Sequence, residues 1–110
     1  MPEFGTLVAE LRNMKQTAFY ITINLKTTHG YECIGKFFVG DDEESATQIF
    51  RQLKGKSKVT EKSLISFDLM ESSQGLPLNV QMISCSLEDV AENCRIITKE
   101  LFRLINLEEI

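Results

Sequence analysis

Apolar and polar residues alternate over residues 19–25 (FYITINL), near the start of the chain. This period of two predicts a half-buried antiparallel strand. A second strand is predicted over residues 31–39, with apolar residues on both faces and a bulge at Gly35. His29 and Gly30 lie between the two strands, and Gly30 is able to adopt the positive φ that a tight hairpin turn requires.

The pattern then changes to the period of a helix. Acidic residues at positions 41–44 suit a first helical turn, because the helix dipole and the free N–H groups favour them there. Gly55 suits the position just after a last turn. We therefore expect a helix over residues 42–54, with an apolar face formed by Ala46, Ile49, Phe50 and Leu53.

The strand–strand–helix pattern occurs a second time. Residues 64–70 alternate again, residues 72–75 have the composition of a turn, and a fourth strand is predicted over residues 76–85. The chain therefore contains two ββα units, over residues 18–55 and 63–107.

The order ββαββα predicts an α+β fold, a two-layer sandwich with a four-stranded antiparallel sheet and both helices on one face. Strand orders 2-1-3-4 and 1-2-4-3 both satisfy this arrangement. Pro77 in the fourth strand and Gly35 in the second suit edge strands, so we expect the order 2-1-3-4. One domain is expected over residues 1–110, with residues 1–6 a vector scar or disordered and residues 7–17 an arm or short helix.

The last predicted helix has more apolar residues than one buried face needs. Ser86 and Asp89 have the spacing of a capping box at its start. Its core stripe consists of Val90, Cys94, Ile97, Leu101 and Leu104. Further apolar residues flank this stripe and form a candidate interface, Ile96, Phe102 and Ile105. Either a second chain or the apolar residues of segment 7–11 are expected to cover them.

Composition narrows the class of protein. The chain is 43% hydrophobic and 25% charged, with a net charge of −4, so a nucleic-acid or membrane-surface partner is not expected. No apolar run approaches the ~18–20 residues of a membrane span, and the amino terminus lacks the order of a signal peptide. The odd number of cysteines (Cys33, Cys85 and Cys94) indicates reduced, buried thiols in a cytoplasmic protein.

No group of residues has the spacing of a catalytic or metal site. His29 is the only histidine and lies in a predicted turn, away from a pocket that a general base needs. The cysteine spacings do not match those of structural zinc sites, and the acidic run at 41–44 lacks the spacing of an EF-hand. We expect no cofactor and no metal, and binding rather than enzyme activity.

Two hypotheses about function follow. The first is a non-enzymatic module that binds another protein or a second copy of itself, most simply as a homodimer. The alternative is a small-ligand-binding protein, or an enzyme, with a site between protomers. Its candidate ligand face is the polar side of the sheet, which carries Tyr20, Thr22, Asn24, Ser66 and Asp68.

Overall fold

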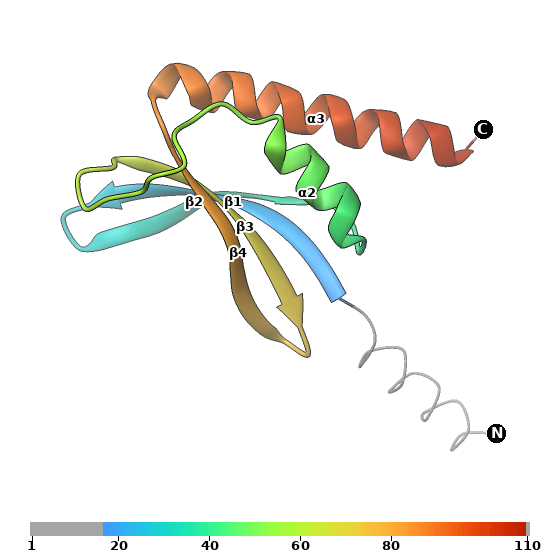
Figure 1. Ribbon diagram of the computed structural model, residues 1–110, viewed down its shortest axis with the longest axis horizontal. Helices are drawn as coiled ribbons and strands as arrows, with labels where there is room; N and C mark the ends of the chain where they lie inside the picture. The colour runs from blue at the N-terminus through green and yellow to red at the C-terminus, as the bar shows by residue number, and fades with distance from the viewer. Residues whose placement is uncertain (1–16, 110) are drawn as a thin grey trace.

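The computed structural model describes residues 17–109, which form one antiparallel sheet and two helices (Figure 1). The elements are β1 (Thr17–Thr27), β2 (Gly30–Phe38), α2 (Glu43–Arg51), β3 (Ile65–Ser73), β4 (Leu76–Cys85) and α3 (Leu87–Glu109). The predictions for residues 1–6 and 7–16 lie outside the described residues, and Thr17 begins β1.

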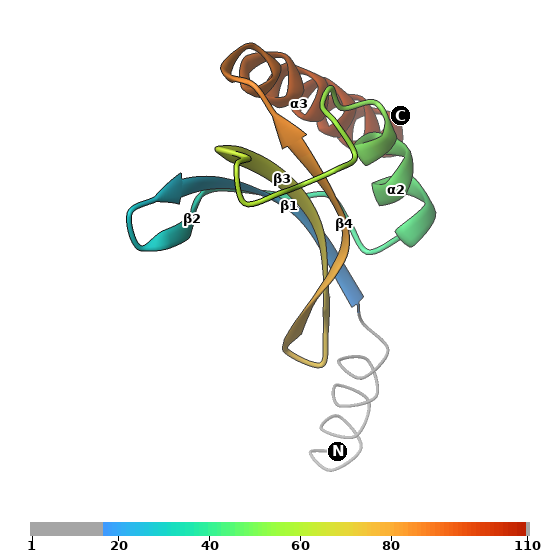
Figure 2. The same ribbon diagram turned by 60° about the vertical axis from the view of Figure 1, so that its left-hand side comes forward.

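The strand order is β2-β1-β3-β4 and every neighbouring pair is antiparallel, as the edge signals in β2 and β4 predicted. Both helices lie on the same side of the sheet (Figures 1 and 2). The α+β class and the two-layer arrangement are therefore confirmed.

The core lies between this sheet face and the helices, and alternation in β1 and β3 determines which residues enter it. In the middle of each strand, at positions 19, 21 and 23 and at 65, 67 and 69, every second residue is apolar and buried in the core, whereas the residues between them face the other side of the sheet. The buried apolar residues of the two central strands are Phe19, Ile21, Ile23, Ile65, Phe67 and Leu69, and those of the helices are Ala46, Ile49, Phe50 and Ile97. The predicted core faces of both helices are confirmed.

Each edge strand carries a bulge opposite a central strand. On β2 the extra residue is Ile34, beside Gly35, because Ile23 pairs with Gly35 while Asn24 pairs with Cys33. The bulge expected at Gly35 is thus confirmed. A second bulge, on β4, was not predicted and leaves Val80 as the extra residue. Bulges bend a strand and increase its twist, so the two edges curve relative to the central pair.

The turns and helix starts follow the sequence signals closely. The first hairpin turns at Thr28 and His29, and Gly30 has φ +111°. The second turns at Gln74 and Gly75, both with positive φ, which is the geometry of a tight two-residue hairpin. The capping box at the start of α3 is reciprocal, since each backbone N–H bonds to the other residue's side chain: Ser86 to Asp89 Oδ2 and Asp89 to Ser86 Oγ.

Helix α2 is shorter than predicted. The expected range was 42–54, but Asp42 is the N-cap and the helix ends at Arg51. Beyond it the N–H of Leu53 bonds to the carbonyl of Phe50, a tighter turn than the α-helical one. The peptide groups of Lys54 do not continue the helix and instead bind an asparagine of α3.

That asparagine is Asn93, which is fully buried. Its Oδ1 accepts a hydrogen bond from the N–H of Lys54 at 2.6 Å, and its Nδ2 donates one to the carbonyl of Lys54 at 2.9 Å. Gly55 follows, where an added Cβ would lie 2.8 Å from the carbonyl oxygen of Ser84. Gly55 is therefore required by its close approach to β4, and not as the helix end that the sequence indicated.

Candidate functional site

The five residues of the candidate ligand face lie together on the sheet face that the helices leave open. Asn24 pairs with Ser66 and Thr22 pairs with Asp68, so polar side chains of β1 and β3 stand next to each other. Tyr20 lies in the next row toward the start of β1. The alternation that placed their neighbours in the core placed these residues on the opposite face.

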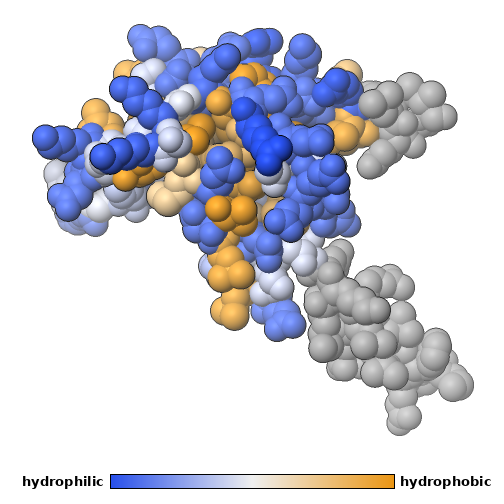
Figure 3. All heavy atoms as spheres, viewed as in Figure 1, coloured by the Kyte–Doolittle hydropathy of each residue, from blue (hydrophilic) through white to orange (hydrophobic). Residues whose placement is uncertain are grey.

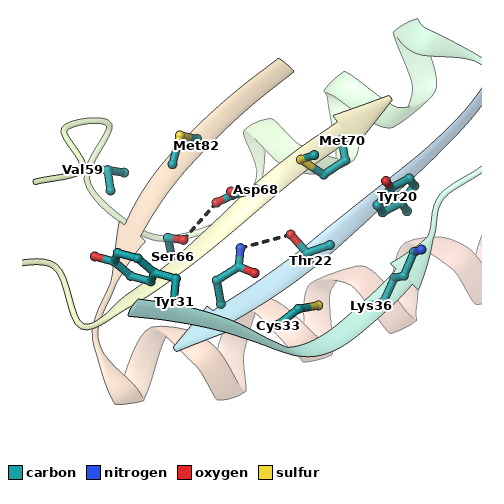
Figure 4. A pocket seen from close by; sticks show the side chains of 11 residues that line it. Tyr20, Thr22, Tyr31, Cys33, Lys36, Val59, Ser66, Asp68, Met70 and Met82 are labelled. Atoms are coloured by element: carbon teal, nitrogen blue, oxygen red, sulfur yellow. Dashed lines mark hydrogen bonds between the residues drawn. The ribbon is translucent and has the colours of Figure 1, made fainter. Parts of the chain in front are cut away.

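These residues form the floor of a hollow of about 440 Å³, which we call the open-face hollow (Figure 4). All four strands and the loop after α2 contribute to it. Its other lining residues are Tyr31, Cys33, Lys36, Val59, Met70 and Met82. Sequence reasoning missed four of them because the edge strands do not alternate regularly, Val59 because it lies in a loop, and Met70 because it is an apolar residue in the polar row of β3.

The polar floor is buried and connected by hydrogen bonds. Ser66 is only 2% exposed, and its Oγ donates to Asp68 Oδ1 at 2.9 Å. Asn79 on β4 donates from Nδ2 to the other oxygen, Oδ2, at 3.2 Å. Thr22 is also buried, and its Oγ1 accepts a hydrogen bond from Asn24 Nδ2 at 3.1 Å. The Asp68 carboxyl is therefore held in a fixed position.

Burial raises the pKa of Asp68 above its ordinary value of 3.8, and hydrogen bonds from Ser66, Asn24 and Asn79 offset only part of this effect. Within the described part of the chain, the ion pairs are Arg95–Glu92 and Arg103–Glu100, and no lysine or arginine pairs with Asp68. A partly desolvated carboxylate without a cation is unfavourable for folding.

Replacing Asp68 with asparagine is expected to leave the protein at least as stable at neutral pH. An acid whose folded pKa is raised costs stability above that pKa, and the cost disappears as pH falls toward the unfolded value. The difference between Asp68→Asn and the wild type should therefore shrink as pH falls toward 3.8. Urea denaturation at neutral and acidic pH measures it. A variant that is much less stable at neutral pH would contradict this reading of Asp68.

The sides of the hollow are aromatic and sulfur-containing. The ammonium of Lys36 lies 4.1 Å from the centroid of the Tyr20 ring, a cation–π contact. The hydroxyl of Tyr31 donates to the backbone carbonyl of Ser63 in the loop before β3, which holds this ring at the edge of the hollow. Met70 and Met82 line the opposite side (Figure 4).

The candidate interface residues lie on α3, in the helix layer. Phe102 is 69% exposed and Ile105 is 58% exposed, whereas Ile96 is half-buried. Beside them, a groove of about 400 Å³ separates the end of α3 from the end of β2. We call the groove, together with Ile96, Phe102 and Ile105, the α3 surface. The groove is lined by Phe38, Val39, Gly40, Asp41, Leu101, Leu104 and Ile105.

A second exposed apolar surface lies on the edge strand β4, and sequence reasoning missed it. Leu76, Leu78 and the bulge residue Val80 are all exposed. Figure 3 shows apolar atoms along this strand, where the hairpin projects away from the helices, and again near the end of α3. Pro77 indicated an edge, but nothing in the pattern indicated that the helices stop short of this hairpin.

The sequence suggested that the cysteines are buried, but one of the three is exposed. Cys85 and Cys94 pack against the core, but Cys33 is exposed on β2, because its side chain points to the open face beside the bulge. Burial, with the nearby Asp89 carboxylate, raises the pKa of the Cys85 thiol to about 11, so this thiol is a poor nucleophile.

The other residues considered for catalysis or metal binding do not lie together. His29 is exposed in its hairpin turn. Asp42 caps α2 by accepting a hydrogen bond from the N–H of Ser45 at 3.0 Å, which explains part of the acidic run without a ligand. Over residues 17–105, whose side chains the structure describes, no three histidine, cysteine or acidic side chains lie close enough to hold a metal ion.

Neither described helix is both long and apolar enough to cross a membrane. A scan against models of protein families, a search of curated proteins and a search of solved structures each found no match to this chain.

Proposed function

We propose that this protein is a non-enzymatic cytoplasmic module that binds a second copy of itself through the α3 surface. The observation that carries the proposal is the exposure of Phe102 and Ile105 beside an apolar groove. Burying such side chains in a contact between chains is favourable, because apolar surface is removed from water.

The arrangement of the α3 surface suits a twofold contact. Phe102 and Ile105 are three residues apart on a helix, so they lie on neighbouring turns of one flank. A twofold axis places the same flank of a second α3 against it, and each copy then covers the other's groove. The last turns of α3 extend beyond the strands (Figure 1).

Charge in this contact should separate the two copies. The double variant Phe102→Glu, Ile105→Glu places two carboxylates in the apolar surface, and we expect it to be a folded monomer while the wild type is a dimer. Light scattering at increasing protein concentration measures the mass, and circular dichroism shows whether each protein is folded.

The matched control is Leu78→Glu, which places a charge on the other exposed apolar surface, on β4. This variant should remain a dimer. If Leu78→Glu were a monomer and the double α3 variant a dimer, the contact would lie at the β4 edge, which would contradict the proposal. A wild type that stays monomeric at high micromolar concentration would also contradict it.

A further inference from the structure

We propose that the open-face hollow binds a small organic ammonium ion, with Asp68 as its counter-charge. The hollow lies on the face of the sheet opposite the helices, so this site is separate from the α3 surface and does not depend on self-association.

The first argument is the state of the carboxylate. Asp68 is the one acidic residue among those that line the hollow, and no described lysine or arginine pairs with it. Ser66 and Asn79 each donate a hydrogen bond to one of its oxygens. Both donors are neutral, so the fixed carboxylate still has no counter-charge, which an organic cation supplies.

The second argument is the chemistry of the walls. Aromatic rings and thioethers contact the methyl and methylene groups of an organic cation favourably, and ring faces attract its charge. Lys36 already shows this attraction, since its ammonium lies over the Tyr20 ring. A calcium ion would need about six oxygen ligands or more, whereas an ammonium ion is satisfied by one carboxylate and apolar walls.

The third argument is size. A volume of about 440 Å³ is near the lower end of small-molecule sites, which suits a ligand of few heavy atoms. Because Ser66 and Thr22 are buried at the floor, the ligand reaches the carboxylate from the open side of the sheet.

Lys36 is expected to affect ligand binding in the opposite direction to Asp68. It lies in the same row across the sheet as Asp68, because both pair with Thr22. Its charge repels a cationic ligand, and its ammonium group covers the face of the Tyr20 ring that a ligand could otherwise contact. Neutralising Lys36 should therefore tighten binding, whereas neutralising Asp68 should weaken it.

Choline chloride is the probe. We expect it to shift the backbone amide NMR signals of residues around Thr22, Asp68 and Cys33, compared with an equal concentration of sodium chloride. The neutral isostere of choline, with a carbon atom in place of the nitrogen, should cause much smaller shifts. Equal binding of the neutral molecule would overturn the proposal, because Asp68 would then have no part in recognition.

Three variants complete the test. Asp68→Asn removes the counter-charge of the choline nitrogen and should weaken choline binding about tenfold or more. Lys36→Gln should strengthen it several-fold. Glu32→Gln makes the same change of charge as Asp68→Asn at an exposed site on β2 and should leave binding unchanged. Unchanged binding in both Asp68→Asn and Lys36→Gln, or equal losses in Asp68→Asn and Glu32→Gln, would overturn the proposal.

Discussion

Replacing Phe50 with alanine is expected to lower the free energy of unfolding by about 3–5 kcal/mol, the usual cost of a cavity left by a buried aromatic ring. Phe50 is 2% exposed and packs in the core between α2 and the sheet. Such a loss is a large share of the total stability of a small domain, which is about 5–15 kcal/mol. Urea denaturation followed by circular dichroism measures it.

The control for this prediction is Leu87→Ala. Leu87 is an apolar residue in the first turn of α3, but its side chain is mostly exposed, so its loss should cost less than about 0.5 kcal/mol. If Phe50→Ala cost under about 1 kcal/mol, α2 would not face the core as described.

The second large effect is expected at Asn93. Replacing it with alanine removes two hydrogen bonds to the peptide groups of Lys54, which leaves the N–H without its side-chain acceptor and the carbonyl with only the weak bond from the Cys85 thiol at 3.3 Å. Because these groups lie in a partly buried contact, we expect a loss of about 2–4 kcal/mol. The same denaturation experiment measures it.

An exposed pair on the same helix provides the comparison. Arg95 also makes two hydrogen bonds, both to the carboxylate of Glu92, but both side chains are well exposed. Arg95→Ala should therefore leave the free energy of unfolding nearly unchanged. Equal losses in the two variants would show that Asn93 does not hold α3 against the loop after α2.

Regular alternation made the central strands predictable. In β1 and β3 a single rule, apolar residues to one face and polar residues to the other, assigned the core residues and also grouped Tyr20, Thr22, Asn24, Ser66 and Asp68. Turn and cap residues were equally informative, because Gly30, Gln74-Gly75 and the Ser86–Asp89 pair act through their own neighbours.

Features that depend on distant contacts were not predictable in the same way. The path of the chain after α2 includes two hydrogen bonds between Lys54 and Asn93, which is 39 residues away. A polar residue on a helix gives no sign in sequence that it will be buried by a partner. The bulge at Val80 likewise depends on how β4 pairs with β3, and this bulge and the one at Ile34 bring edge residues around the open-face hollow.

The extent of the helix layer was the third unpredicted feature. The apolar pattern of the last helix indicated surplus surface at Phe102 and Ile105, and both are exposed. It did not indicate that Leu76 and Leu78 would also be exposed, since this depends on where the helices lie relative to the projecting hairpin.

Contacts between copies can be observed directly in a mixture of two differently isotope-labelled preparations of the wild type, by NMR experiments that record only intermolecular proximities. Self-association through the α3 surface predicts proximities between the Ile105 methyl groups of one copy and the Phe102 or Phe38 ring of another. Their absence at high micromolar concentration, or intermolecular proximities confined to Leu76, Leu78 and Val80 on β4, would contradict it.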